Sequence, residues 1–155
     1  MKTVKKTSIF PVSRKIIFEK LQKLETLQYI AFPYATFTPV HSDDSLVWKP
    51  GKSSSYRFRI GGIIPLGIHT INIERFDVDE VASKESNRFV PVWNHRIYLK
   101  DLGKKTEYTD EVDIDAGWKT LFVWLWAEAF YTHRQKKWAR LLKRDKCISE
   151  ESIMD

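Results

Sequence analysis

The chain has 155 residues, of which 43% are hydrophobic and 30% are charged, and its formal net charge is +6. This length suits one domain, and the composition is too apolar for a disordered chain. The longest apolar run, Leu121–Ala127, is far shorter than the roughly 18 residues that a membrane span needs. The N-terminus has no signal-peptide pattern and Cys147 is the sole cysteine, so the sequence predicts a soluble, cytoplasmic protein.

Aromatic residues make up 14% of the chain, with six Trp, six Tyr and nine Phe. Each buried ring covers a large area, so we expect a wide core or a cavity with aromatic walls. The excess of positive charge is modest and is typical of an ordinary soluble surface. We therefore expect no nucleic-acid partner.

The N-terminal part of the chain predicts a strand and two short helices. Thr3–Phe10 alternates in the manner of a strand, and Pro11 ends it. A second short helix is predicted at Glu25–Ile30, and Pro33 stops it. The first helix lies between these segments, where apolar residues recur at helical spacing at Ile17, Leu21 and Leu24.

From Tyr34 to Asp115 the apolar residues recur with a period of two, which is typical of antiparallel strands. Gly and Pro residues between the apolar runs supply the turns. The pattern predicts about six strands in this part of the chain. They are Tyr34–Val40, Tyr56–Ile60, His69–Ile73, Glu80–Glu85, Phe89–Lys100 and Lys105–Ile114.

The last two of these strands are joined by the turn Asp101–Lys104, in which Gly103 can adopt a positive φ. If Asp101 lies opposite Lys104, the register of the whole pair follows. One face of the ladder is then apolar and aromatic and the other carries opposite charges, which supports this register. The predicted pairs on the apolar face are Leu99 with Thr106, Ile97 with Tyr108, His95 with Asp110, and Trp93 with Val112.

The C-terminal part predicts one long helix from Trp118 to about Lys143. Its first half is apolar nearly all round, which implies contacts on more than one side. We expect the folded domain to span residues 1–146 and the acidic residues 147–155 to form a frayed tail. One apolar stripe along the helix consists of Trp118, Phe122, Leu125 and Ala129.

The tryptophans of this helix need more than one partner. Trp124 and Trp126 lie about 160° apart around the helix axis, so one sheet cannot contact both. We expect packing within the chain or a homodimer through this Trp-rich C-terminal helix. Contact with a membrane surface is not expected, because a segment that is apolar all round has no separate polar face to keep in water.

The order of the elements indicates an α+β fold. A curved antiparallel sheet of about six to seven strands has one face to bury, and a single long helix is the natural cover. With two short helices closing one end, a pocket remains between the sheet and the long helix.

Several stretches of the sequence carry a family resemblance: Phe10–Ser13, Leu24–Val40, Trp93–Arg96, Thr106–Val112 and Tyr131–Leu142. They resemble the START-like or Bet v 1-like helix-grip domains of the SRPBCC superfamily, which includes polyketide cyclase-related bacterial proteins. The resemblance implies a helix-grip fold and a deep hydrophobic cavity for lipids, sterols, polyketides or other apolar ligands. It implies no catalytic residue, because the superfamily shares none, and we expect no cofactor.

The leading hypothesis is a module that binds an apolar or amphipathic small molecule under the long helix. His69, His95 and Asp110 would supply the few polar contacts that such a pocket usually has. Hydrophobic side chains would form the remaining walls. These are Tyr56, Phe58, Ile71, Trp93, Ile97, Tyr108, Phe122 and Leu125.

A second hypothesis is an enzyme of the polyketide cyclase or dehydratase kind. His95, oriented by Asp110, would remove a proton next to a carbonyl, and Tyr108 would polarise the carbonyl oxygen. The same pair can instead be a buried polar contact that fixes the strand register. Two histidines and one carboxylate without a fixed spacing do not predict a metal, and we expect no metal site.

A third hypothesis is a non-catalytic scaffold, a homodimer whose pocket is filled by its own aromatic rings. The many Phe, Tyr and Trp residues make such filling feasible. The volume of the space between sheet and helix separates this hypothesis from the first.

Overall fold

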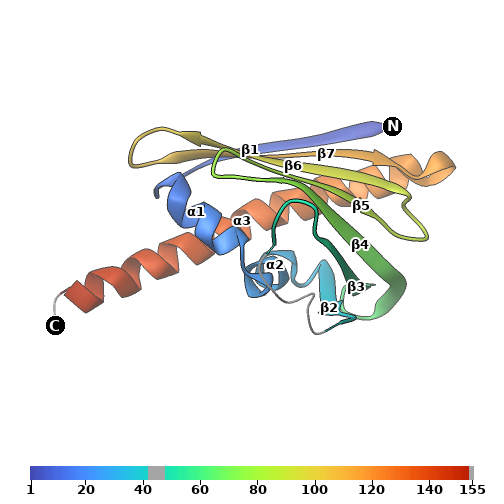
Figure 1. Cartoon of the computed structure of the whole chain (residues 1–155), viewed down its shortest axis with the longest axis horizontal. Coiled ribbons are helices and arrows are strands. Elements are labelled where there is room, and N and C mark those ends of the chain that lie inside the picture. Colours follow the sequence, from blue (N-terminus) through green and yellow to red (C-terminus); the bar gives the residue numbers. More distant parts are fainter. Residues whose placement is uncertain (42–47, 154–155) are drawn as a thin grey trace.

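The computed structural model describes residues 1–41 and 48–153, and Figure 1 shows how their helices and strands are arranged. One strand comes first, two short helices follow, and six further strands precede a 3₁₀ turn and one long helix. The elements are β1 (Lys2–Phe10), α1 (Arg14–Leu21), α2 (Leu24–Ala31), β2 (Ala35–Pro39), β3 (Ser53–Ile60), β4 (Ile64–Phe76), β5 (Glu80–Ser86), β6 (Val92–Asp101), β7 (Thr106–Asp115), η2 (Gly117–Lys119) and α3 (Thr120–Ile153).

The strands form one seven-stranded antiparallel sheet in the order β1-β7-β6-β5-β4-β3-β2, so β1 and β2 are its edges. The sheet is curved, α3 runs along its inner face, and α1 and α2 lie beside α3 (Figure 1). This arrangement confirms the predicted α+β helix-grip fold. The inner face of the sheet is apolar because alternate residues of each strand point to the same side.

The ladder between β6 and β7 differs from the predicted register by two residues. Asp101 pairs with Thr106 and not with Lys104, because the turn contains the four residues Leu102–Lys105. A shift of two residues leaves every side chain on its predicted face, so the apolar and charged faces are as expected. The observed pairs on the apolar face are Leu99 with Tyr108, Ile97 with Asp110, His95 with Val112, and Trp93 with Ile114.

Helix α3 is longer than the sequence pattern predicts. It continues past Lys143 to Ile153, so the segment 147–153 is helical where a frayed tail was expected. No Gly or Pro interrupts it, and an ion pair between Lys20 and Asp145 ties it to α1. Residues 154 and 155 of the expected tail lie outside the described residues. None of the described helices carries an apolar stretch long enough to span a membrane.

The buried side chains form two hydrophobic clusters under α3. The first cluster lies under the N-terminal half of α3, and the second lies under its C-terminal half, next to α1. Members of the first cluster include Phe37, Phe58, Ile71, Ile73, Trp93, Phe130 and Tyr131. Members of the second cluster include Phe10, Ile17, Leu99, Tyr108, Trp138 and Leu142.

Candidate functional site

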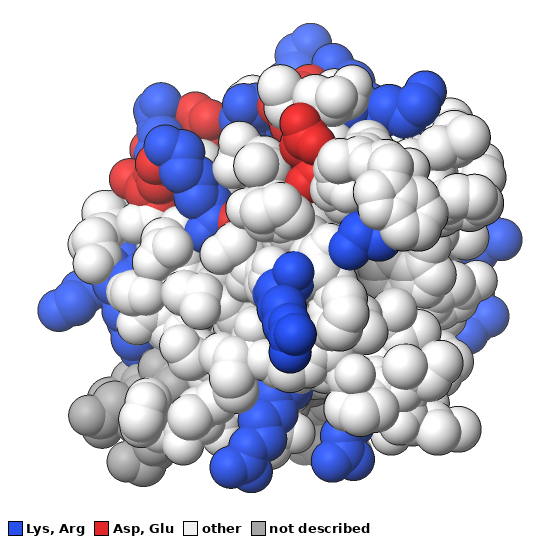
Figure 2. Space-filling model, turned by 90° about the vertical axis from the view of Figure 1, so that its right-hand side faces the viewer, with Lys and Arg blue, Asp and Glu red and all other residues white. Residues whose placement is uncertain are grey.

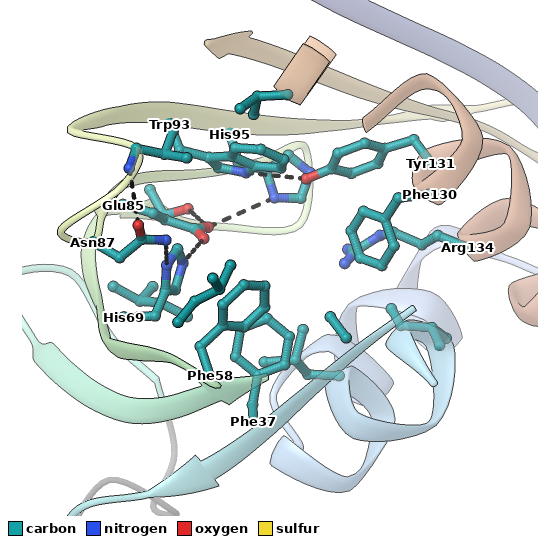
Figure 3. A pocket seen from close by; sticks show the side chains of 18 of the residues that line it. Phe37, Phe58, His69, Glu85, Asn87, Trp93, His95, Phe130, Tyr131 and Arg134 are labelled. Carbon is teal, nitrogen blue, oxygen red and sulfur yellow. Dashed lines mark hydrogen bonds and ion pairs between the residues drawn. The ribbon is translucent and has the colours of Figure 1, made fainter. Parts of the chain in front are cut away.

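A cavity of about 320 Å³ lies between the sheet and the N-terminal half of α3. Figure 3 shows it from close by, with aromatic side chains on several sides. This volume lies at the lower end of the range of roughly 300–1,000 Å³ that small-molecule pockets span. The described side chains therefore leave the space open, and the filling that the scaffold hypothesis requires is not observed among them.

Most of the residues that the sequence assigns to a pocket do line this cavity. They are Phe58, His69, Ile71, Trp93, His95, Ile97 and Phe122. Tyr108 does not line the cavity, because it lies in the second cluster. Asp110 does not line it either, because it lies behind His95. Tyr56 is fully buried without reaching the cavity surface, and Leu125 is 53% exposed on the outer side of α3.

The opening of the cavity lies where α3 begins. Phe89 and Phe122 both line the cavity and are exposed, and Lys119 joins them. The Lys119 ammonium donates to the Phe89 carbonyl at 3.1 Å, which links η2 to the loop before β6. Figure 2 views this end of the molecule, and most of the surface in this view is uncharged.

One wall of the cavity is polar and begins with His69 on β4. Its Nε2 is 2.8 Å from Oε2 of Glu85 on β5. The Asn87 side-chain oxygen accepts the N–H groups of Phe89 and Val90, which orients the amide so that Nδ2 donates to His69 Nδ1 at 3.3 Å. His69 therefore carries its proton on Nε2 and donates it to Glu85.

His95 on β6 lies between two carboxylates in the same wall. Its Nε2 is 2.8 Å from Asp110 Oδ1, and its Nδ1 is 3.8 Å from Glu85 Oε1. The predicted contact with Asp110 is thus present, although the two residues are diagonal neighbours in the ladder and not a direct pair. The Ser83 hydroxyl also donates to Glu85 Oε1, at 2.7 Å.

Helix α3 also contacts Asp110, through Gln135 and through Arg134, which is itself one of the residues that line the cavity. Arg134 Nε is 3.4 Å from Asp110 Oδ1, and Gln135 Nε2 donates to Oδ2 at 3.3 Å. The Tyr108 hydroxyl donates to Asp110 at 3.2 Å and accepts from Arg134 Nη2 at 3.3 Å. Buried ionisable groups therefore follow one another from β5 to α3 in the order Glu85, His95, Asp110 and Arg134, of which Figure 3 shows Glu85, His95 and Arg134.

These contacts shift the pKa values of the buried groups toward their charged forms. Burial opposes the protonation of His95, but the hydrogen bond to Asp110 and the nearby Glu85 carboxylate outweigh it and raise the pKa of His95. Burial also opposes ionisation of Glu85, yet the hydrogen bond from His69 and the nearby His95 ring lower its pKa. Arg134 and His95 lower the pKa of Asp110 against the same penalty. The carboxylates of Glu85 and Asp110 are thus favoured in their charged forms by the neighbouring His95 ring and Arg134 guanidinium.

The sequence pattern did not single out two charged residues of this wall, Glu85 and Arg134. Glu85 follows the inward-facing Ser83 by two residues, so the strand alternation carried a signal, but β5 is too polar to look buried. Arg134 lies four residues from both Phe130 and Trp138, on the buried side of α3. Its position among other basic residues made it resemble a solvated helix end.

His69, Glu85 and His95 together resemble a set of metal ligands, since imidazole and carboxylate groups bind several transition metals. Across residues 1–41 and 48–153, however, no group of three or more His, Cys, Asp or Glu residues has a metal-binding arrangement. Here the imidazoles instead hold the carboxylates by hydrogen bonds and ion pairing.

The sequence matches no protein-family model and no curated protein sequence. Several solved structures are nevertheless similar. Protein CV1439 from Chromobacterium violaceum is 9% identical with a TM-score of 0.72, over 90% of this chain and 96% of that one. A START superfamily protein from Mycobacterium smegmatis is 14% identical with a TM-score of 0.71, over 92% and 97% of the two chains.

DynU16, a protein in the dynemicin biosynthetic locus, is also similar in structure. It is 14% identical with a TM-score of 0.61, and the match covers 92% of this chain but 48% of DynU16. At such low identities these similarities concern the fold alone. The chain has the START-like helix-grip fold that the sequence motifs predicted.

Proposed function

We propose that the protein binds an apolar small molecule that carries a hydroxyl group, in the cavity between the sheet and α3. The observation that carries the proposal is the contrast between the largely apolar cavity walls and the single wall with His95 and Glu85. Burial of the apolar part of the ligand would provide about 25 cal/mol per Å² before entropic costs. The lipids and polyketides that the START-like resemblance implies have this amphipathic character.

The hydroxyl group follows from the space between His95 and Glu85. His95 Nδ1 and Glu85 Oε1 are 3.8 Å apart, which is longer than a normal hydrogen bond. A hydroxyl oxygen on the cavity side of both atoms, within hydrogen-bond distance of each, can accept from Nδ1–H and donate to the carboxylate, so neither group loses its partner when water leaves. A ligand carboxylate could not donate to Glu85 and would add a like charge beside it.

The alternative of a cyclase or dehydratase requires His95 to accept a proton. Both of its ring nitrogens face carboxylates, and these contacts raise the pKa of His95, which favours the protonated ring. Such an imidazole is a poor general base and a good hydrogen-bond donor. Tyr108, the expected oxygen-polarising group, donates its hydroxyl to Asp110 and does not line the cavity. The geometry therefore favours binding over proton abstraction.

Two matched probes, 1-decanol and decyl methyl ether, test the proposal because they differ in the hydroxyl proton. Displacement of a fluorescent apolar dye from the purified protein measures the affinity of each probe. A hydrogen bond to a charged group contributes about 1.5–3 kcal/mol, so we expect the alcohol to bind at least about tenfold more tightly. Native mass spectrometry of the same protein would reveal a co-purified ligand.

A matched pair of variants locates the binding. Ile73→Phe adds volume inside the cavity and should weaken both probes at least about tenfold. Ile9→Phe adds the same group on exposed β1 and should leave both affinities unchanged. Equal affinities for alcohol and ether would remove the hydroxyl from the proposal, and failure of both probes to bind would overturn it.

A further inference from the structure

Several large apolar side chains are exposed around the opening of the cavity. Three segments at the same end of the molecule each contribute to the cavity lining: residues 61–68 at the β3–β4 hairpin, residues 87–91 before β6, and residues 117–125 of η2 and α3 (Figure 1). Ile63 and Trp118 are each 83% exposed. We call six of the exposed large residues of these segments the mouth patch: Ile63, Ile64, Phe89, Trp118, Leu121 and Phe122.

The mouth patch is not a by-product of core packing. Gly61 and Gly62, with φ of 61° and 72°, form the hairpin turn, and the next residues are isoleucines where turns normally carry polar side chains. Trp124 and Trp126 of α3, in contrast, have contacts within the chain. Trp124 donates to the Thr3 carbonyl at 3.0 Å, and Trp126 lines the cavity. An exposed apolar patch that neither the turn nor the packing of the core requires is typical of an interaction site.

The charges in these three segments have one sign. Residues 61–68, 87–91 and 117–125 contain Arg88 and Lys119 and no Asp or Glu. Lys119 Nζ lies 5.5 Å from the centroid of the Phe89 ring, so a cation is adjacent to an apolar ring of the patch. Figure 2 shows Lys and Arg residues scattered over this end of the molecule, with the acidic residues gathered toward one edge of the view.

We propose that the mouth patch docks on the surface of an anionic lipid bilayer. Trp and Phe rings favour the headgroup region, the isoleucines reach the acyl chains, and Arg88 and Lys119 are attracted by anionic lipids. A second copy of the chain fits this surface less well, because docking would bring the same cations of both copies together without a compensating acid. This proposal differs from the expectation, drawn from Trp124 and Trp126, that a membrane surface is not a partner.

This docking goes beyond the proposed ligand binding and does not depend on it. Because the cavity opens between Phe89 and Phe122, docking would place the opening against the bilayer. An apolar ligand could then pass between membrane and cavity without crossing water. Ligand affinity in solution and vesicle binding are separate measurements, so either proposal can fail alone.

Flotation of the full chain with lipid vesicles tests the docking. One set of vesicles is pure phosphatidylcholine, and a second contains phosphatidylserine as about a third of the lipid. We expect binding to the anionic vesicles that is at least tenfold stronger than to the neutral ones and that weakens with added salt. The double variant Ile63→Ser/Trp118→Ser should bind at least tenfold less, because both side chains are exposed and neither supports the core.

The control variant is Ile153→Ser, which removes an equally exposed isoleucine at the other end of α3 and should bind as the wild type does. Circular dichroism melts verify that all variants are folded. Absence of wild-type binding to anionic vesicles, or unchanged binding by the double variant, would overturn the proposal. So would a dimer in sedimentation experiments that the double variant abolishes, because the patch would then be a self-association surface.

Discussion

Helix α3 covers two regions of one sheet that are packed very differently. Under its C-terminal half, Tyr108 contacts Phe10 and Trp138, with ring centroids 5.4 and 5.6 Å apart. Under its N-terminal half, Phe58 and Trp93 belong to walls around a cavity of about 320 Å³. Both regions are rich in aromatic rings, so ring content alone does not decide whether a core is filled.

The difference follows from where the rings are attached. The second cluster draws its rings from β1 and β7, which are neighbouring strands, and from α3 directly above them. The first cluster also contains the α3 rings Phe130 and Tyr131, but its strand rings come from β2, β3 and β6, which are spread across the curved sheet. The curvature of the sheet therefore keeps opposite walls apart in the first region. The buried Asp110–Arg134 pair lies beside the second, filled region.

The largest effect should come from removing Asp110. Asp110→Ala leaves Arg134 buried without its carboxylate and takes away the partner of His95. Breaking a buried pair on one side typically costs about 3–5 kcal/mol, and we expect a loss of this size in the free energy of unfolding by urea. As a control, Glu111→Ala breaks a partly exposed pair with Arg96 and should cost below about 1 kcal/mol. Similar losses in both variants would contradict the structural role of Asp110.

Several features of this wall were predictable from local periodicity. The alternation in β6 and β7 placed His95 and Asp110 on one inner face, and that result survives an error of two residues in the register. The register itself was not predictable, because a turn that starts at Asp101 with two or with four residues uses the same polar sequence. The sequence therefore predicts the sheet face on which a residue lies more reliably than it predicts the residue opposite it on the next strand.

Other features depend on partners that lie far apart in the sequence. Glu85 and Arg134 are acceptable in a buried wall because His69, His95 and Asp110 come from other elements to meet them. Without those partners a charged residue is expected in solvent. The outward position of Leu125 was equally hidden, because the first half of α3 is apolar on every side and no stripe stood out.

The comparison of the two regions predicts unequal costs for the same substitution. Phe10→Ala removes a ring from the filled region and should lower the free energy of unfolding by about 3–5 kcal/mol. Phe58→Ala removes a ring that already borders the cavity, so fewer contacts are lost and the cost should be smaller. Urea titration of both variants measures the difference, and an equal or larger cost for Phe58→Ala would contradict the comparison.

Enlarging a buried side chain should lower stability by less than the ring deletions do. The loss should again be greater in the filled region than at the cavity. Ile17→Phe overpacks a fully buried position in the same cluster as Trp138 and should cost about 1–3 kcal/mol. Ile73→Phe points into the cavity, where space exists, and should change stability by less than about 1 kcal/mol. Thermal melts of the two variants provide the measurement. If Ile73→Phe were the more destabilising variant, the first region would be as tightly packed as the second.

The smallest effect we expect is a pH dependence that sharpens the role of His95. Its pKa is raised above the unfolded value of 6.5, so its stabilising contribution is complete below that pH and is lost as the pH rises through the folded value. The lowered pKa values of Glu85 and Asp110 act at the acid end, where stability falls below about pH 4. The wild type should therefore lose stability relative to His95→Gln as the pH rises above 6.5. Urea midpoints across this range measure it, and parallel pH profiles for the two proteins would mean that His95 is buried neutral between its carboxylates.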